Sequence, residues 1–110
     1  MTIVPVDSRG HVSVEEILNA ITPKTVLVSL MMVNNEIGTI HDIHEIGKAL
    51  DARRKKEGSV YPLLHSDASQ APNYLEVDVE RLHVDLLTLS SPKVYGPRGA
   101  GALFIRRNTP

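Results

Sequence analysis

The sequence predicts an α/β fold, a mainly parallel sheet with flanking helices, and three observations favour it. Short apolar runs bounded by turn residues alternate with segments of helical periodicity, which is typical of βαβ units. Residues 25–33 are almost continuously apolar and rich in β-branched side chains, so we expect a parallel strand covered on both faces. A chain of 110 residues, 42% of them hydrophobic, is long enough for one ordinary core. We therefore expect one domain or part of one.

Capping patterns and apolar spacing predict two helices. The first begins after Ser13, which forms a capping box with Glu16, and ends at residues 22–24. The second is capped by Asp42 and runs to about Lys56. Each helix has an apolar stripe at helical spacing: Ile17, Leu18 and Ile21 in the first, and Ile43, Ile46 and Leu50 in the second.

The remaining elements are short. We expect strands at 60–64, 84–89 and 102–105, and a helical turn at 78–82 before the last two strands. Residues 1–6 are expected to form a short strand or an entry segment. The predicted order is helix, strand, helix, strand, turn, strand, lysine loop, strand.

Composition and charge narrow the function. A net charge of -1 and a pI near 6.5 give no general attraction to nucleic acid or to an anionic membrane. The basic residues at 53–56 suit the negative end of the helix dipole, and we interpret them as a solvated helix end before Gly58. There is no apolar run of about 18 residues and no secretory signal, so we expect a cytoplasmic protein. With no cysteine, the chain has no disulfide, thiolate metal site or cysteine nucleophile of its own.

Lys93 is the most informative residue. It lies in the Pro/Gly-rich turn 90–101, between two strand-like runs, and therefore at the carboxyl end of a strand, where ligands bind in open α/β sheets. A partly desolvated lysine there can form a Schiff base. Asn35 and Asp67 also follow predicted strands. A lysine that binds an aldehyde, a carboxylate that keeps a pyridine nitrogen protonated and an amide that bonds a ring oxygen suit pyridoxal phosphate. Taken singly, each is equally compatible with an exposed lysine or a turn former.

Three segments carry a family resemblance: 28–38, 65–71 and 84–103. They resemble the cysteine desulfurases, class V pyridoxal-phosphate enzymes of fold type I, in the same order along the chain and nearly from end to end. The resemblance implies that residues 1–110 are a single partial domain, the central part of the large cofactor-binding domain. It also implies a homodimer that takes sulfur from L-cysteine and delivers it to an acceptor or scaffold protein, for iron–sulfur clusters or thiolated tRNA, without a nucleic-acid or membrane partner.

The resemblance also assigns roles to individual residues. Lys93 would bind pyridoxal 5'-phosphate covalently and later move the Cα proton of the substrate. Asp67 would pair with the pyridinium nitrogen, Asn35 and Gln70 would contact the ring or its phenolic oxygen, and Ser90 would contact the phosphate. No catalytic role is assigned to His65, which precedes that aspartate.

The chain departs from the family pattern in two ways. The family usually has Ser-Gly-His-Lys at the lysine, whereas this chain has Ser90-Ser91-Pro92-Lys93, so the histidine that helps to hold phosphate is missing. Pro92 is also expected to push Ser91 toward an extended conformation. In addition, family members are several times longer, and the sulfur-accepting cysteine is absent from these residues, so they cannot complete desulfuration alone.

Other interpretations remain open. The chain is compatible with a selenocysteine lyase or another class V enzyme, or with a truncated, non-catalytic remnant. His41 and His44, three residues apart, could bind a metal, although no third ligand is evident. The loop Gly96–Gly101 loosely resembles a phosphate-binding glycine loop, but it leads into a strand rather than a helix. If the sheet is part of a larger one, exposed edges and apolar surface predict poor solubility of the isolated chain.

Overall fold

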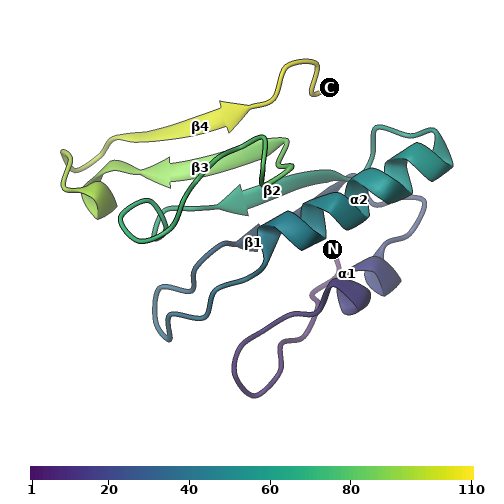
Figure 1. Ribbon diagram of the computed structural model, residues 1–110, viewed down its shortest axis with the longest axis horizontal. Coiled ribbons are helices and arrows are strands. Elements are labelled where there is room, and N and C mark those ends of the chain that lie inside the picture. Colours follow the sequence, from purple (N-terminus) through teal and green to yellow (C-terminus); the bar gives the residue numbers. More distant parts are fainter.

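The computed structural model describes residues 1–110 and has the expected order of elements (Figure 1). The elements are α1 (Val14–Ala20), β1 (Leu27–Met31), α2 (Ile43–Glu57), β2 (Leu63–Asp67), β3 (Leu86–Ser90), the 3₁₀ helix η1 (Ser91–Val94) and β4 (Gly101–Ile105). The expected helical turn at 78–82 forms a turn with a Leu82 N–H to Asp78 C=O hydrogen bond of 2.9 Å. The strand considered for residues 1–6 does not form.

The four strands make one sheet in the order β1-β2-β3-β4. The pairs β1–β2 and β2–β3 are parallel, and β4 runs antiparallel to β3. The predicted mainly parallel α/β sheet is therefore confirmed. The helix α2 connects β1 to β2 and lies across the sheet (Figure 1).

The helix caps match the sequence prediction. The Ser13 hydroxyl accepts a hydrogen bond from the Glu16 N–H, and the Glu16 carboxylate accepts one from the Ser13 N–H. Asp42 caps α2 by accepting from the Glu45 N–H at 3.0 Å. Gly58 ends α2 in the left-handed conformation, with φ 61°, which glycine adopts without steric cost.

The core lies between α2 and one face of the sheet. Ile43, Ile46 and Leu50 of α2 are at most 2% exposed, and they face the equally buried Leu64 and Leu87 of the sheet. Burying each such side chain contributes about 1.5–3 kcal/mol. Residues of the segment 71–83 complete the cover: Ala71, Leu75, Val77, Val79 and Leu82.

The opposite face of the sheet is open, which corrects the expectation that β1 is covered on both faces. Side chains along β1 alternate between exposed and half-buried. Leu27 and Met31 are 45% and 37% exposed, and Leu103 and Ile105 of β4 are 55% and 57% exposed. The continuous apolar run of β1 therefore covers the core with one set of side chains and presents the other set to solvent.

The strand predicted at 60–64 forms three residues later. Pro62 has no N–H to donate, and the ladder begins at Leu63, whose N–H bonds the Val26 carbonyl. The strand then continues through His65 and Ser66, which we expected to lie in the following turn. His65 has a hydrogen-bond partner on each neighbouring strand, Ser29 at 2.7 Å and Thr88 at 2.8 Å, so its ring can stay inside the sheet. The buried Ser66 hydroxyl has no hydrogen-bond partner.

The basic end of α2 is only partly solvated, which corrects the interpretation of residues 53–56. The side chain of Arg54 is 13% exposed and pairs with Asp85 at 2.7 Å and with Asp51. Burial opposes the charge on Arg54, but its hydrogen bonds to these two carboxylates outweigh burial and raise the pKa of the guanidinium. Asp85 also accepts from the Leu64 N–H at 2.8 Å. The cluster thus ties α2 to the start of β2 and β3.

Gly47 sets how closely α2 approaches the turn before β3. A Cβ added there would lie 2.5 Å from the Leu82 carbonyl oxygen and 2.6 Å from the His83 Cβ. We predict that Gly47→Ala lowers stability by about 1–3 kcal/mol through overpacking, although alanine is the better helix former by about 1 kcal/mol. Urea unfolding measures this change. Lys48→Ala, at the adjacent exposed position, is the control and should change stability little; an unchanged or raised midpoint for Gly47→Ala would contradict the prediction.

Asp51 makes the free energy of unfolding depend on pH in the acid range. Burial opposes its ionisation, but hydrogen bonds from Arg54 and His83 outweigh burial and lower the pKa of Asp51 below its ordinary 3.8. A lowered native pKa gives stability that is present above the ordinary pKa and lost as the pH falls through the native one. We predict that the urea midpoint of unfolding at neutral pH is higher for the wild type than for Asp51→Asn. This difference in midpoint should disappear below about pH 4. A gap of constant size across this range would show that the carboxylate charge is not responsible.

Candidate active site

The carboxyl ends of the three parallel strands lie at one edge of the sheet (Figure 1). Asp67 is the last residue of β2 and pairs in register with Met31 of β1 and Thr88 of β3. Ser90, the last residue of β3, lies two residues further along that strand. The turns after β1, β2 and β3 therefore begin at neighbouring positions along this edge.

Lys93 is held in a short and strongly constrained turn. It lies in η1, directly after β3. Pro92 occupies the first turn of η1, where backbone N–H groups have no partner within the helix, so the N–H that proline lacks costs no helical hydrogen bond. Ser91 belongs to the same 3₁₀ helix, so the extended conformation expected for it before proline does not occur. Tyr95 closes the turn with φ 62°, and the Tyr95 and Gly96 N–H groups both bond the Ser91 carbonyl.

Gly96 is required by this turn. A Cβ at Gly96 would lie 2.2 Å from the Ser91 hydroxyl oxygen and 3.1 Å from its carbonyl oxygen. The following residues lead into β4, not into a helix. The loop Gly96–Gly101 therefore shapes the lysine turn and does not place a helix N-terminus against a phosphate.

Asn73 also fixes the lysine turn, a role that no sequence pattern beyond ordinary turn chemistry indicates. Its side-chain amide donates to the Lys93 carbonyl at 2.7 Å. Asn73 lies in the turn after β2, a few residues beyond Asp67 and Gln70, so this bond ties the turn after β2 to the turn after β3. The side chain of Lys93 itself is exposed and makes no ion pair.

Asp67 has one carboxylate oxygen in use. Its Oδ1 atom accepts from the Ser69 N–H at 2.8 Å, and the residue is exposed at the edge. On the same face, the ring of His65 bonds hydroxyls on both sides. His65 thereby fixes the strands beneath Asp67, and both of its ring nitrogens are engaged.

The remaining predicted residues lie at the same edge. Asn35 is exposed in the turn after β1. Asn34 is structural, because its side-chain oxygen Oδ1 accepts from the Glu36 and Ile37 N–H groups at 2.9 and 3.1 Å. Gln70 and Ser90 are half-buried. All five predicted site residues thus belong to the ends of β2 and β3 or to the turns that follow β1, β2 and β3. No hydrogen bond joins Lys93 to Asp67.

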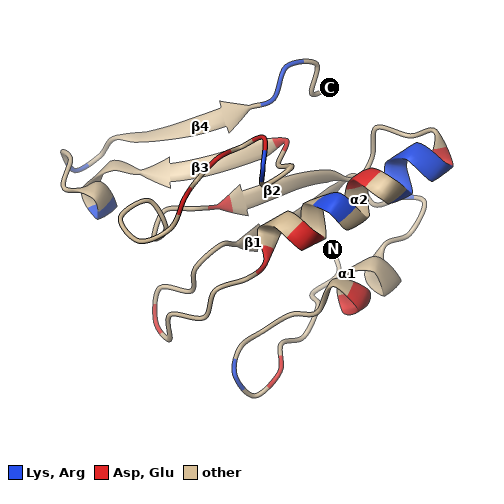
Figure 2. Cartoon of the chain, viewed as in Figure 1, with Lys and Arg blue, Asp and Glu red and all other residues tan.

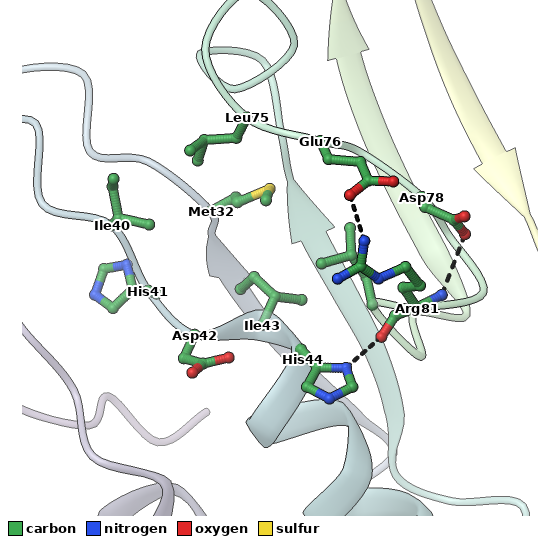
Figure 3. A pocket seen from close by; sticks show the side chains of 11 residues that line it. Met32, Ile40, His41, Asp42, Ile43, His44, Leu75, Glu76, Asp78 and Arg81 are labelled. Carbon is green, nitrogen blue, oxygen red and sulfur yellow. Dashed lines mark hydrogen bonds and ion pairs between the residues drawn. The ribbon is translucent and has the colours of Figure 1, made fainter.

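A separate cavity of about 440 Å³ lies between the start of α2 and the segment 75–82, and contains none of these five residues (Figure 3). Its polar groups already have partners within the chain. Arg81 pairs with Glu76, the Arg81 N–H bonds Asp78 at 3.1 Å, and the His44 ring bonds the Arg81 carbonyl at 2.5 Å. His41 contacts two other carbonyls, and the chain has no group of three or more potential metal ligands. Neither α1 nor α2 has the length and hydrophobicity of a membrane-spanning helix.

Comparison with known proteins agrees with this geometry. The family model for class V aminotransferases matches residues 1–109. The chain is 50% identical over 106 residues to cysteine desulfurase IscS of Clostridium botulinum, covering 96% of this chain and 25% of that protein. It is 47% identical over 107 residues to cysteine desulfurase IscS of Methanosarcina thermophila, covering 97% and 25%.

Solved structures give the same result. A NifS-like protein superposes with a TM-score of 0.87 at 38% identity, covering 99% of this chain and 28% of that one. SspA in complex with cysteine superposes with a TM-score of 0.82 at 35% identity, covering 99% and 30%. The chain therefore belongs to the class V aminotransferase family, whose members use pyridoxal phosphate. The two curated relatives named above are cysteine desulfurases, and the chain spans about a quarter of their length.

Proposed function

We propose that residues 1–110 form the lysine-bearing part of the cofactor site of a cysteine desulfurase. One observation carries the proposal: Lys93, with no ion-pair partner, and Asp67 lie at the same sheet edge, and Asn73 links the turn that follows Asp67 to the turn that contains Lys93. Similarity to the desulfurases, as high as 50% identity, supports the choice of reaction.

The residues at the edge fit pyridoxal phosphate. The cofactor supplies an aldehyde that condenses with an amine and a pyridine ring that accepts electrons. Lys93 is an exposed amine, and the Oδ2 atom of Asp67 has no partner in the chain, so it can accept a hydrogen bond from a pyridine N–H. Asn35 offers an uncommitted amide, and Ser90 a hydroxyl where β3 gives way to the lysine turn.

Each residue then has a defined task. Lys93 would hold the aldehyde of the cofactor, and its amine would move the Cα proton of L-cysteine. Asp67 holds the proton on the pyridine nitrogen, because a carboxylate stabilises an adjacent positive charge. Asn35 and Gln70 contact the ring, and Ser90 contacts the phosphate.

The overall reaction converts L-cysteine and a thiol to alanine and a persulfide. Residues 1–110 contain no cysteine, so they do not supply the thiol. We propose that the whole protein is a homodimer that passes this sulfur to an acceptor or scaffold protein for iron–sulfur clusters or tRNA thiolation. The proposed location is the cytoplasm, although some relatives are named as mitochondrial.

The test uses a chimera in which residues 1–110 replace the matching quarter of the Methanosarcina thermophila relative. We predict that borohydride reduction fixes pyridoxal phosphate on Lys93, detected by peptide mass spectrometry, and that the chimera releases alanine from L-cysteine. Lys93→Arg should abolish the adduct and lower the rate by at least about 100-fold, because a guanidinium stays protonated and cannot act as nucleophile or base.

Lys24→Arg is the matched control, because Lys24 is exposed in a turn outside the candidate site. It should leave both the adduct and the rate unchanged. An adduct spread over several lysines and undiminished in Lys93→Arg would show that Lys93 is an ordinary solvated lysine and would favour the non-catalytic remnant.

Pro92 stands where the family has a phosphate-contacting histidine. We predict that Pro92→His in the chimera slows release of pyridoxal phosphate by about tenfold, because one hydrogen bond to a charged group contributes about 1.5–3 kcal/mol. Dilution into apo-desulfurase, followed by the return of activity in the acceptor, measures that rate. Pro92→Ala separates the new contact from the loss of the proline ring; equal rates for the two variants would count against a phosphate contact at this position.

A further inference from the structure

The turn that carries Asn35 is a hairpin that projects from the end of β1. Val33 and Ile40 form an isolated antiparallel bridge at its base, and the Asn34 N–H bonds the Thr39 carbonyl at 2.9 Å. Glu36 and Ile37, near its tip, are exposed. The hairpin buries little apolar surface of its own, so polar contacts at its side and base must fix its direction.

A second turn, residues 7–11, lies against this hairpin and is closed by hydrogen bonds of its own. The Asp7 carboxylate accepts from the Arg9 and His11 N–H groups at 2.8 and 2.9 Å. These two backbone hydrogen bonds lower the pKa of Asp7, which marks them as bonds to the charged form. Gly10 occupies the left-handed region with φ 81°.

Three contacts join the turn 7–11 to the hairpin side. The Thr39 hydroxyl donates to the Arg9 carbonyl at 2.7 Å. Gly10 packs so closely that an added Cβ would lie 2.6 Å from Ile37 Cδ1 and 3.1 Å from the Thr39 hydroxyl oxygen. The third contact is the ring of His41, which is 8% exposed and lies within 3.2 Å of the Gly10 carbonyl oxygen through Nε2.

His41 has a second contact through its other nitrogen. Its Nδ1 atom lies 3.0 Å from the carbonyl oxygen of Met31, the last residue of β1. Carbonyl oxygens only accept, so a ring nitrogen that carries a proton donates to the carbonyl oxygen it faces. The His41 ring therefore connects the end of β1 to the turn 7–11. These two segments flank the base of the hairpin.

We propose that His41 is a positioning residue: it braces the hairpin against the turn 7–11 and so holds Asn35 at the carboxyl edge. This rests on the proposed function, in which Asn35 contacts the cofactor ring. His41 does not touch the cofactor; it acts through the direction of the hairpin, and the bond from Nε2 to Gly10 is the one that matters.

Two conservative substitutions separate the two bonds. The amide nitrogen of asparagine replaces ring Nδ1, and that of glutamine replaces ring Nε2. In the chimera, we expect His41→Gln to keep the bond to Gly10. Its hydrogen-exchange rate in the segment 31–42 and its rate of pyridoxal phosphate release should stay within about twofold of the wild-type values. His41→Asn and His41→Ala should lose that bond. The loss of one such hydrogen bond corresponds to a change of about fivefold in the equilibrium between the closed and the open hairpin.

Two measurements report the loss. Hydrogen exchange of the segment 31–42 should quicken about fivefold in His41→Asn and His41→Ala, while core segments around Leu64 and Leu87 keep their protection. Release of pyridoxal phosphate should quicken by a similar factor. Equal impairment in His41→Gln would overturn the proposal, because the ring would then only fill space, and so would wild-type behaviour of His41→Ala.

A glycine pair provides an independent test. Gly10→Ala places a methyl group against Ile37 and Thr39, whereas Gly58→Ala meets no atom within 4 Å, and both positions have positive φ, at 81° and 61°. Only Gly10→Ala should quicken exchange in the segment 31–42; equal exchange in both variants would contradict a brace at this turn. If the wild-type chimera forms no adduct on Lys93, the proposed function fails, yet the exchange comparison still decides whether His41 braces the hairpin.

Discussion

Burial of one stripe of α2 determines the arrangement of everything else in this structure. Ile43, Ile46 and Leu50 are nearly inaccessible to solvent beneath the face of the sheet that carries Leu64 and Leu87. Because α2 must return over that face, β2 runs parallel to β1, and the segment 71–83 brings β3 in parallel as well. Three carboxyl ends then meet at one edge, where Met31, Asp67 and Thr88 lie side by side although they come from three different strands.

Packing does not hold the turns at that edge, which are fixed by side chains that bond to backbone groups. Asn73 bonds the Lys93 carbonyl, Asn34 caps its own turn, and His41 reaches two carbonyls. Such bonds are short and directional, so each turn has one conformation without burying apolar surface. The reactive groups of Lys93 and Asp67 consequently stay exposed while their backbones are restrained. The basic end of α2, where Arg54 makes its ion pairs, lies at the far end of the helix from this edge (Figure 2).

The sequence predicts the parts of this arrangement that depend on local chemistry. The Ser13 capping box, the Asp42 cap, a glycine stop and apolar spacing predict both helices, and the turn residues around Lys93 place it at a strand end. Contacts between distant segments could not be predicted in this way. His65 and Ser66 look like turn residues until Ser29 and Thr88 are known to flank His65, and Arg54 looks solvated until Asp85 is found beside it. Asn73 and His41 were missed as contributors to the site for the same reason, because their partners are backbone carbonyls that no residue pattern reveals.

The hydrogen-bonded row formed by Ser29, His65 and Thr88 also fixes the register of the strands. Side chains in a strand alternate between faces, so a slip of β2 by one residue would turn His65 toward α2 and separate it from both hydroxyls. The same slip would carry the Asp67 carboxylate under the helix, where an unpaired charge loses its hydration at a cost of several kcal/mol. A sheet with a shifted register therefore loses the hydrogen bonds of His65 and also buries the Asp67 charge. The Asp67 carboxylate, which belongs to the candidate site, thus also favours the correct register.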